Sequence, residues 1–132
     1  MKGELVEVTL EESGREVVVA RAEVLRSWWR RARGLLGTCL DSGARCVLLT
    51  PCASVHTFGM RYAIDVALVG ESGEVLGSWR GLRPGRLVRA RGACHALERP
   101  SMPGPWPCVG QQLGIRIVDE ETRGENRCLE CR

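Results

Sequence analysis

The chain has 132 residues, of which 44% are apolar and 27% are charged, and this composition is typical of a folded globular protein and excludes a disordered chain. Its length suits one domain that buries roughly two-thirds of the surface of the unfolded chain in a single core. The formal net charge of +3 is spread over 19 basic and 16 acidic side chains, so nucleic-acid binding would need a local basic patch, such as residues 26–33.

The sequence also bears on the compartment. No stretch approaches the roughly 18 apolar residues that span a bilayer, and residues 1–17 lack the continuous apolar segment of a secretory signal. The seven cysteines are an odd number, and we expect most of them to be thiols that pack as small apolar side chains. We therefore expect a cytoplasmic protein.

The first part of the chain has the pattern of short strands. Residues 5–10 and 16–22 are rich in β-branched side chains and flank the turn-like residues 12–15, which predicts a hairpin. Residues 45–50 form a further predicted strand, which ends at Pro51 because proline cannot donate a ladder hydrogen bond.

One helix is predicted, over residues 27–36. Ser27 can cap its first turn, and Gly37 can end it because glycine adopts the left-handed conformation without a Cβ clash. Its apolar side chains recur at the spacing of one helix face, at Trp28, Ala32, Leu35 and Leu36. The tryptophans and arginines of this helix could contact a membrane surface or nucleic acid, or Trp28 could pack in the core beside a solvated basic face.

Residues 62–69 alternate as a strand with two distinct faces. One face is predicted to carry Tyr62, Ile64, Val66 and Leu68, and the other Ala63, Asp65, Ala67 and Val69. The turn-like residues 70–73 lead into residues 74–82, which predicts a second hairpin. Gly59 marks a bend between this strand and the residues before it.

The C-terminal part has a proline-glycine turn at residues 83–86, followed by predicted strands at 87–91 and 94–99. Residues 100–107 contain four prolines and are predicted to be a loop, and residues 113–119 alternate as a last strand.

The predicted fold class is therefore mainly β. About eight short strands and one short helix favour a compact single-domain β-sandwich or barrel. We expect this domain to span residues 1–119, and the polar tail at residues 120–132 to fray.

The central stretch follows the pattern P-C-x-x-[IV]-H-T-x-x-M-R and then isoleucine-aspartate, at Pro51, Cys52, Val55, His56, Thr57, Met60, Arg61, Ile64 and Asp65. Weaker matches lie at residues 31–37 (RARGLLG), 82–86 (LRPGR) and Leu97-Glu98. In these residues the chain resembles the DUF192 (UPF0127) family. The resemblance implies a mainly β fold and brings no established activity. Gly110-Gln111 departs from the Gly-Asp pair common in the family, so no role that needs that carboxylate is carried over.

Three ionisable side chains are the main candidates for a site. Asp65 lies in an apolar strand beside small side chains, and a buried carboxylate needs a cation or several donors, for which His56, Arg61, Arg33 and Arg86 are candidates. Glu98 shares a predicted face with Cys94 and Ala96, so two carboxylates facing one hollow could act as general acid and base. His56 can exchange a proton near neutral pH. Each could equally be structural, with Asp65 accepting backbone N–H groups, Glu98 in a salt bridge and His56 in a hydrogen bond.

We therefore expect a small ligand- or partner-binding β-domain with a polar pocket around His56, Asp65 and Glu98. The residues expected to bind the ligand are Arg33, His56, Thr57, Met60, Asp65, Arg86 and Glu98. One alternative is a small hydrolase-type enzyme that uses His56 or the two carboxylates. A second alternative is an interaction module that acts through the helix at residues 27–36.

No metal or cofactor is expected. Cys52, His56, Cys94 and His95 are soft ligands with an irregular spacing, and a single C-x-x-C pair at Cys128 and Cys131 is half of a zinc site. The small net charge argues against nucleic acid as the partner.

Overall fold

The computed structural model describes residues 4–26 and 46–118, which form nine strands. They are β1 (Leu5–Glu12), β2 (Arg15–Leu25), β3 (Cys46–Leu49), β4 (Ser54–His56), β5 (Ile64–Gly70), β6 (Val75–Leu82), β7 (Leu87–Arg89), β8 (Ala93–Pro100) and β9 (Leu113–Ile117). The predicted mainly β chain is confirmed. The described residues contain no helix, and thus none long and apolar enough to cross a membrane. The helix predicted over residues 27–36 and the tail at 120–132 lie outside them.

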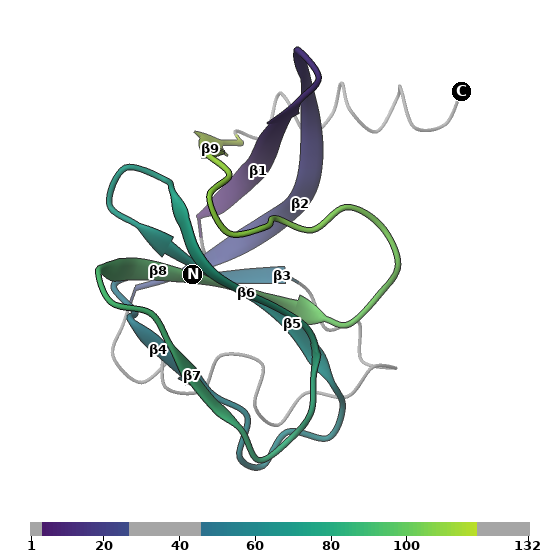
Figure 1. Cartoon of the computed structure of the whole chain (residues 1–132), viewed down its shortest axis with the longest axis vertical. Helices are drawn as coiled ribbons and strands as arrows, with labels where there is room; N and C mark the ends of the chain where they lie inside the picture. The colour runs from purple at the N-terminus through teal and green to yellow at the C-terminus, as the bar shows by residue number, and fades with distance from the viewer. Residues whose placement is uncertain (1–3, 27–45, 119–132) are drawn as a thin grey trace.

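Seven strands form one mixed sheet in the order β6-β5-β8-β3-β2-β1-β9, and β4 pairs with β7 in a separate two-stranded ribbon (Figure 1). β2 and β3 are parallel, whereas the other neighbouring strands of the sheet are antiparallel. The edge strands β6 and β9 meet at one end, where Glu74 bridges Gln112 and the Val75 N–H donates to the Gln111 carbonyl oxygen over 2.9 Å. They do not pair along their lengths, so the predicted barrel is wrong in that the sheet is not closed.

Both predicted hairpins are confirmed. β1 and β2 join through Ser13 and Gly14, whose φ angles of 53° and 77° are the two positive values that a type I′ hairpin turn requires. β5 and β6 pair antiparallel around residues 71–74. Turn chemistry in the sequence thus predicts which consecutive strands are neighbours.

Two apolar cores lie on the two faces of β5, whose seven residues are all buried. Ala67 and Val69 belong to the core shared with β1 and β2, as the predicted alternation requires. Ile64, Val66 and Leu68 belong to a second core. The β4–β7 ribbon closes this second core through Val55 and Val88, and Figure 1 shows the ribbon on the side of the sheet away from the β1–β2 hairpin.

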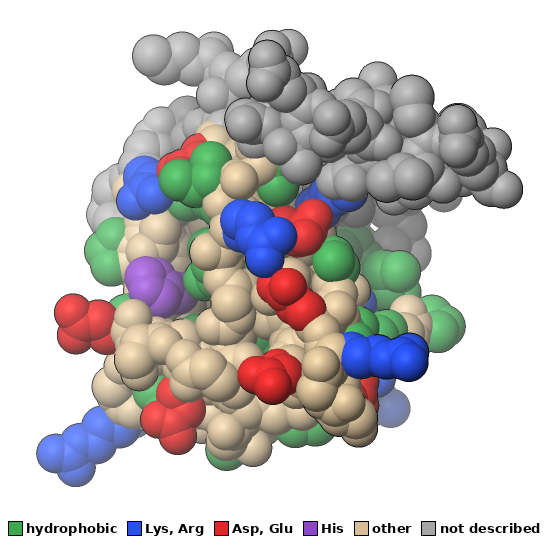
Figure 2. Space-filling model, turned by 90° about the horizontal axis from the view of Figure 1, so that it is seen from above, with side chains coloured by type: hydrophobic (Ala, Val, Ile, Leu, Met, Phe, Trp, Pro, Cys, Tyr) green, Lys and Arg blue, Asp and Glu red, His purple; other side chains and the backbone are tan. Residues whose placement is uncertain are grey.

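Charge is unevenly distributed between the two ends of the molecule. Residues 4–26, which include the β1–β2 hairpin, carry six glutamates and three arginines. The view from above shows acidic side chains spread over the end toward which this hairpin projects (Figure 2). Salt bridges join Arg21 to Glu7 and Arg26 to Glu4 within this segment. The hairpin end therefore combines an acidic excess with two arginines that are already paired.

Candidate functional site

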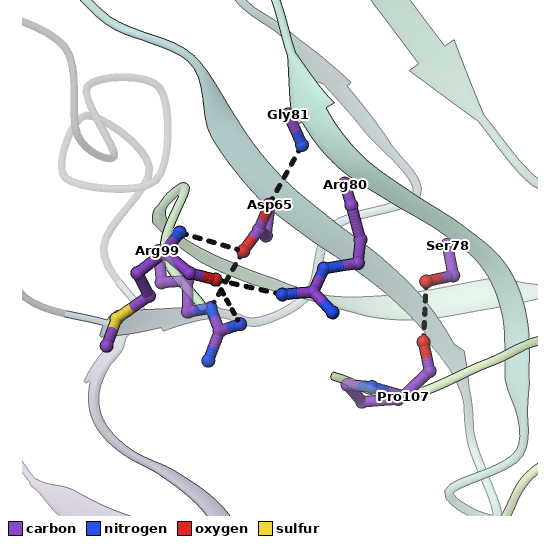
Figure 3. Close-up of polar contacts among 7 residues, drawn as sticks. Asp65, Ser78, Arg80, Gly81, Arg99 and Pro107 are labelled. Carbon is purple, nitrogen blue, oxygen red and sulfur yellow. Dashed lines mark hydrogen bonds and ion pairs between the residues drawn. The ribbon is translucent and has the colours of Figure 1, made fainter. Parts of the chain in front are cut away.

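Asp65 lies at the centre of a buried polar cluster (Figure 3). β5 places it opposite Arg99 of β8, and the Arg99 Nε donates to Asp65 Oδ2 over 2.9 Å. The Gly81 N–H donates to Asp65 Oδ1, also over 2.9 Å. The side chains of Asp65 and Arg99 are 0% and 5% exposed. The expectation that Asp65 has a partner is therefore confirmed, but the partner is Arg99, which was not among the candidates.

The same cluster fastens the proline-rich loop at residues 100–107 to the sheet. The Met102 carbonyl oxygen accepts from Arg80 over 2.8 Å and from Arg99 over 3.3 Å. The Arg99 guanidinium carbon lies 4.5 Å from the ring centroid of Trp106, which is a cation–π distance. The Ser78 hydroxyl donates to the Pro107 carbonyl oxygen over 2.6 Å. Asp65 thus accepts the backbone N–H group of Gly81, as the alternative reading of its carboxylate expected, and pairs with Arg99 beside this loop.

The environment of Asp65 holds its carboxyl group ionised. Burial alone raises its pKa, but hydrogen bonds from Gly81, Arg99 and Ser101 and the charge of Arg99 lower it, so that the pKa lies below its ordinary value of 3.8. The ionised form is thus favoured by folding, which ties the stability of the fold to pH.

We predict a loss of stability in acid that is specific to Asp65. Because its folded-state pKa is depressed, its contribution is fully present above pH 3.8 and is lost as the pH falls below that value through the folded-state pKa. Urea unfolding of the wild type and of Asp65→Asn, measured from about pH 6 to about pH 2.5, should show the two free energies converging in acid. A constant difference across this range would contradict the prediction.

Glu98 does not share a hollow with Asp65. In β8 it lies opposite Val66 of β5 and Val47 of β3, and both valines belong to the second core. Cross-strand partners point to the same face, whereas Asp65 and Val66 are consecutive and point to opposite faces. The two carboxylates therefore lie on opposite faces of the sheet, and the predicted pocket around His56, Asp65 and Glu98 is wrong in this respect.

Thr57 and Met60 are buried and position the polypeptide. The Thr57 hydroxyl donates to the Arg83 carbonyl oxygen over 2.7 Å and accepts from the Arg86 N–H over 2.8 Å. Its backbone N–H and carbonyl bond to Arg86 and Gly85. Met60 packs in the second core. Neither side chain is placed to meet a ligand from solvent, while Arg86 is exposed and Arg33 lies outside the described residues.

Thr57→Val is expected to lower the free energy of unfolding by about 1–3 kcal/mol, because it keeps the shape of the side chain and leaves both Arg83 and Arg86 backbone groups without this partner. Thr57→Ser keeps the hydroxyl and is the matched control. Chemical unfolding of the two variants checks the difference. If Thr57→Ser is as unstable as Thr57→Val, the loss of stability comes from packing and not from the lost hydrogen bonds.

His56 lies on the outer face of the β4–β7 ribbon. Val55 and Val88 point into the second core, so Ser54, His56, Leu87 and Arg89 point outward by alternation. The rings of His56 and Phe58 stack with centroids 5.7 Å apart and an interplanar angle of 23°. Phe58 is 55% exposed and Leu87 is 60% exposed. The ribbon thus displays two stacked rings and an apolar side chain to solvent.

Arginines are frequent in the segment that pairs with the residues carrying these rings. Residues 51–63 carry one arginine and residues 80–91 carry five, and neither segment contains an aspartate or glutamate. Arg83, Arg86, Arg89 and Arg91 are all exposed. Among the described residues, Arg21, Arg26, Arg99 and Arg116 form salt bridges, whereas Arg83, Arg86, Arg89 and Arg91 form none. We call residues 54–58 and 83–91 the basic ribbon.

Sequence reasoning located its basic patch at residues 26–33 and missed the basic ribbon. Four arginines without an acidic residue in RPGRLVRAR, at residues 83–91, could have revealed it. Its proximity to His56 and Phe58 follows from the pairing of β4 with β7, which no sequence pattern indicated.

The four cysteines of the described residues are free thiols, as expected for most of the seven. Burial raises the pKa of the Cys46 thiol from 9.0 to about 12, so it packs as an apolar group. Cys52 and Cys94 donate to the Ser54 and Gly92 carbonyl oxygens. No group of three or more potential metal ligands occurs within residues 4–26 and 46–118, and Cys128 and Cys131 lie outside these ranges.

The second histidine is also accounted for by local contacts. His95 Nδ1 lies 2.7 Å from the Thr50 hydroxyl. Burial and the charge of Arg26 lower the pKa of His95 below its ordinary 6.5, although Glu71 opposes this. Neither histidine hydrogen-bonds to a carboxylate among the residues that the structure describes.

No family model and no curated protein matches the chain. Two solved structures share its fold, each with a TM-score of 0.64. One is a protein of unknown function from Novosphingobium aromaticivorans, with 18% identity over 83% of this chain and 84% of that chain. The other is described as a candidate transcription regulator from Sinorhizobium meliloti, with 15% identity over 85% of this chain and 92% of that chain. Identities this low establish the common fold alone.

Proposed function

We propose that this protein is a binding domain that recognises an anionic partner through the basic ribbon. The observation that carries the proposal is the group of exposed arginines on residues 83–91, with no acidic residue in the segments that form this surface. Exposed cations gathered in one short segment attract an anion at long range and provide charge-assisted hydrogen bonds on contact. The pattern from Pro51 to Asp65 also leads us to propose membership of the DUF192 family.

The exposed apolar groups support the same surface. Phe58 and Leu87 are each more than half exposed beside the arginines. Large apolar side chains left in water and flanked by polar groups mark interaction sites more often than isolated surface residues do. Thr57 and the second core hold this surface in place from beneath, so its side chains are displayed on a fixed backbone.

The polar groups of the sheet are not part of the proposed site. Asp65 is already neutralised by Arg99, and Glu98 is buried on the face of the sheet that carries the second core. A ligand at Asp65 would have to displace Arg99 and the Gly81 N–H, both of which hold the fold together. The proposed partner therefore meets the outside of the ribbon.

Retention on immobilised heparin, a generic polyanion, tests the proposal. The double variant Arg86→Gln/Arg89→Gln removes two charges from the basic ribbon, and Arg15→Gln/Arg116→Gln removes two from exposed positions at β2 and β9. We expect the ribbon variant to elute at clearly lower salt than the wild type, and the control to elute close to the wild type. If the elution of both double variants shifts equally, retention depends on net charge alone and not on the basic ribbon. If the wild type is not retained at about 0.15 M salt, the proposal is overturned.

A further inference from the structure

We infer that the anionic partner of the basic ribbon is a single-stranded nucleic acid, an inference that rests on the proposed function. Two features beyond charge lead to it: a stacked pair of exposed rings, and cations placed at separate points along residues 83–91. Proteins that bind single strands without sequence preference combine these two features, because arginines meet the phosphates while aromatic rings stack on unpaired bases.

The rings are arranged for stacking. His56 and Phe58 are two residues apart, their planes differ by 23° and their centroids are 5.7 Å apart. Phe58 keeps 55% of its surface exposed despite this contact. A planar, apolar face that is held in position by a neighbouring ring suits a flat partner such as a base.

The cations favour a polymer over a single small anion. Arg86 and Arg89 are three residues apart across the start of β7, and three residues of extended chain span about 10 Å. Arg89 shares the outer face with His56 and Leu87 by the pairing of β4 with β7. Successive phosphates of a strand can engage the two cations separately, whereas a single small anion would have to draw both side chains together. The bases of a duplex are already stacked on one another, so a single strand is the form that can also use the rings.

Fluorescence anisotropy of the full chain at about 0.1 M salt tests the inference with labelled 12-nucleotide probes. The probes are a single-stranded DNA, the RNA of the same sequence, the DNA duplex and an abasic strand with the same phosphates. Binding to vesicles of phosphatidylserine and phosphatidylcholine is measured in parallel, to test a membrane surface as the partner. We expect the single strands to bind more tightly than the duplex and the abasic strand, and the comparison of DNA with RNA identifies which of the two the ribbon prefers.

Variants separate the rings from the charges. Phe58→Ala should weaken single-strand binding by between about 5-fold and about 100-fold and leave the abasic strand unaffected. Arg89→Gln should weaken both probes and reduce the slope of log affinity against log salt by about 0.7. Ile117→Ala, which removes an exposed apolar side chain from β9, should change neither. His56→Ala removes the other ring of the stacked pair and should have the same effects as Phe58→Ala.

The outcomes distinguish this inference from the proposed function. Equal affinities for the abasic and single-stranded probes, or a tighter duplex, would overturn the nucleic-acid inference and leave the anion-binding surface standing. Binding to the vesicles alone would replace nucleic acid with a membrane. If the protein binds none of the anionic probes, heparin included, both the nucleic-acid inference and the proposed function are overturned.

Discussion

Replacing Asp65 with alanine is expected to lower the free energy of unfolding by about 3–5 kcal/mol, because it leaves the buried guanidinium of Arg99 without its carboxylate. The Gly81 N–H loses its acceptor in the same variant. The loop at residues 100–107 should loosen as well, since Arg99 and Arg80 both donate to the Met102 carbonyl oxygen. Urea unfolding followed by tryptophan fluorescence measures the loss.

The control for this prediction is an ion pair in water. Glu16→Ala breaks the exposed pair with Arg116, and should cost less than about 1 kcal/mol. The double variant Asp65→Leu/Arg99→Met removes both buried charges and should regain much of the stability that Asp65→Ala loses. A loss below about 1 kcal/mol for Asp65→Ala would show that water reaches Arg99 and replaces the carboxylate.

The burial of this pair explains why a carboxylate in an apolar strand misleads a search for a site. A charged side chain buried among apolar residues needs an opposite charge or several hydrogen-bond donors, and the sequence does not show which residues supply them. Here the compensation comes from Arg99, which is adjacent to Glu98 in the sequence and opposite Asp65 in the sheet. Sequence reasoning selected Glu98 at this point because it is a carboxylate that shares a predicted strand face with the small side chains of Cys94 and Ala96.

The alternation within each strand was predictable, but the register between strands was not. The two faces of residues 62–69 follow from the period of an extended chain, and the two cores confirm them. Whether Asp65 and Glu98 share a face depends on the pairing of β5 with β8, in which Val66 lies opposite Glu98. A shift of one residue would have put the two carboxylates on the same face. β5 and β8 are not joined by a turn, so no turn sequence was available from which their register could be predicted.

The β4–β7 ribbon was the least predictable part of the fold. Its strands have three residues each, and about 30 residues of sequence separate them. A strand this short shows a single alternation, which many loops also show. What pairs them is the burial of Val55 and Val88 in the second core, together with the hydrogen bonds of Thr57 to Arg83 and Arg86. The candidate site therefore depends on long-range packing.

The second core supports this ribbon, and Leu68 is the residue whose truncation should damage that core most. Leu68 is fully buried in β5, and its cross-strand neighbours are Gly77 of β6 and Ala96 of β8. Because both neighbours are small, they cannot fill the space that a shorter side chain would leave. Leu68→Ala should therefore lower the free energy of unfolding by about 3–5 kcal/mol, in the upper part of the range for such truncations.

Leu68→Met keeps the volume of the side chain and should cost less than about 1.5 kcal/mol, which makes it the matched control in the same urea titration. Amide hydrogen exchange adds a test of location. Since Val55 and Val88 belong to the same core as Leu68, the amides of β4 and β7 should exchange faster in Leu68→Ala relative to those of β1 and β2. Uniformly faster exchange in all four strands would mean that the ribbon opens only with the whole sheet. Faster exchange confined to β4 and β7 would tie the binding surface to this core, so that core truncation should weaken anion binding without touching an arginine.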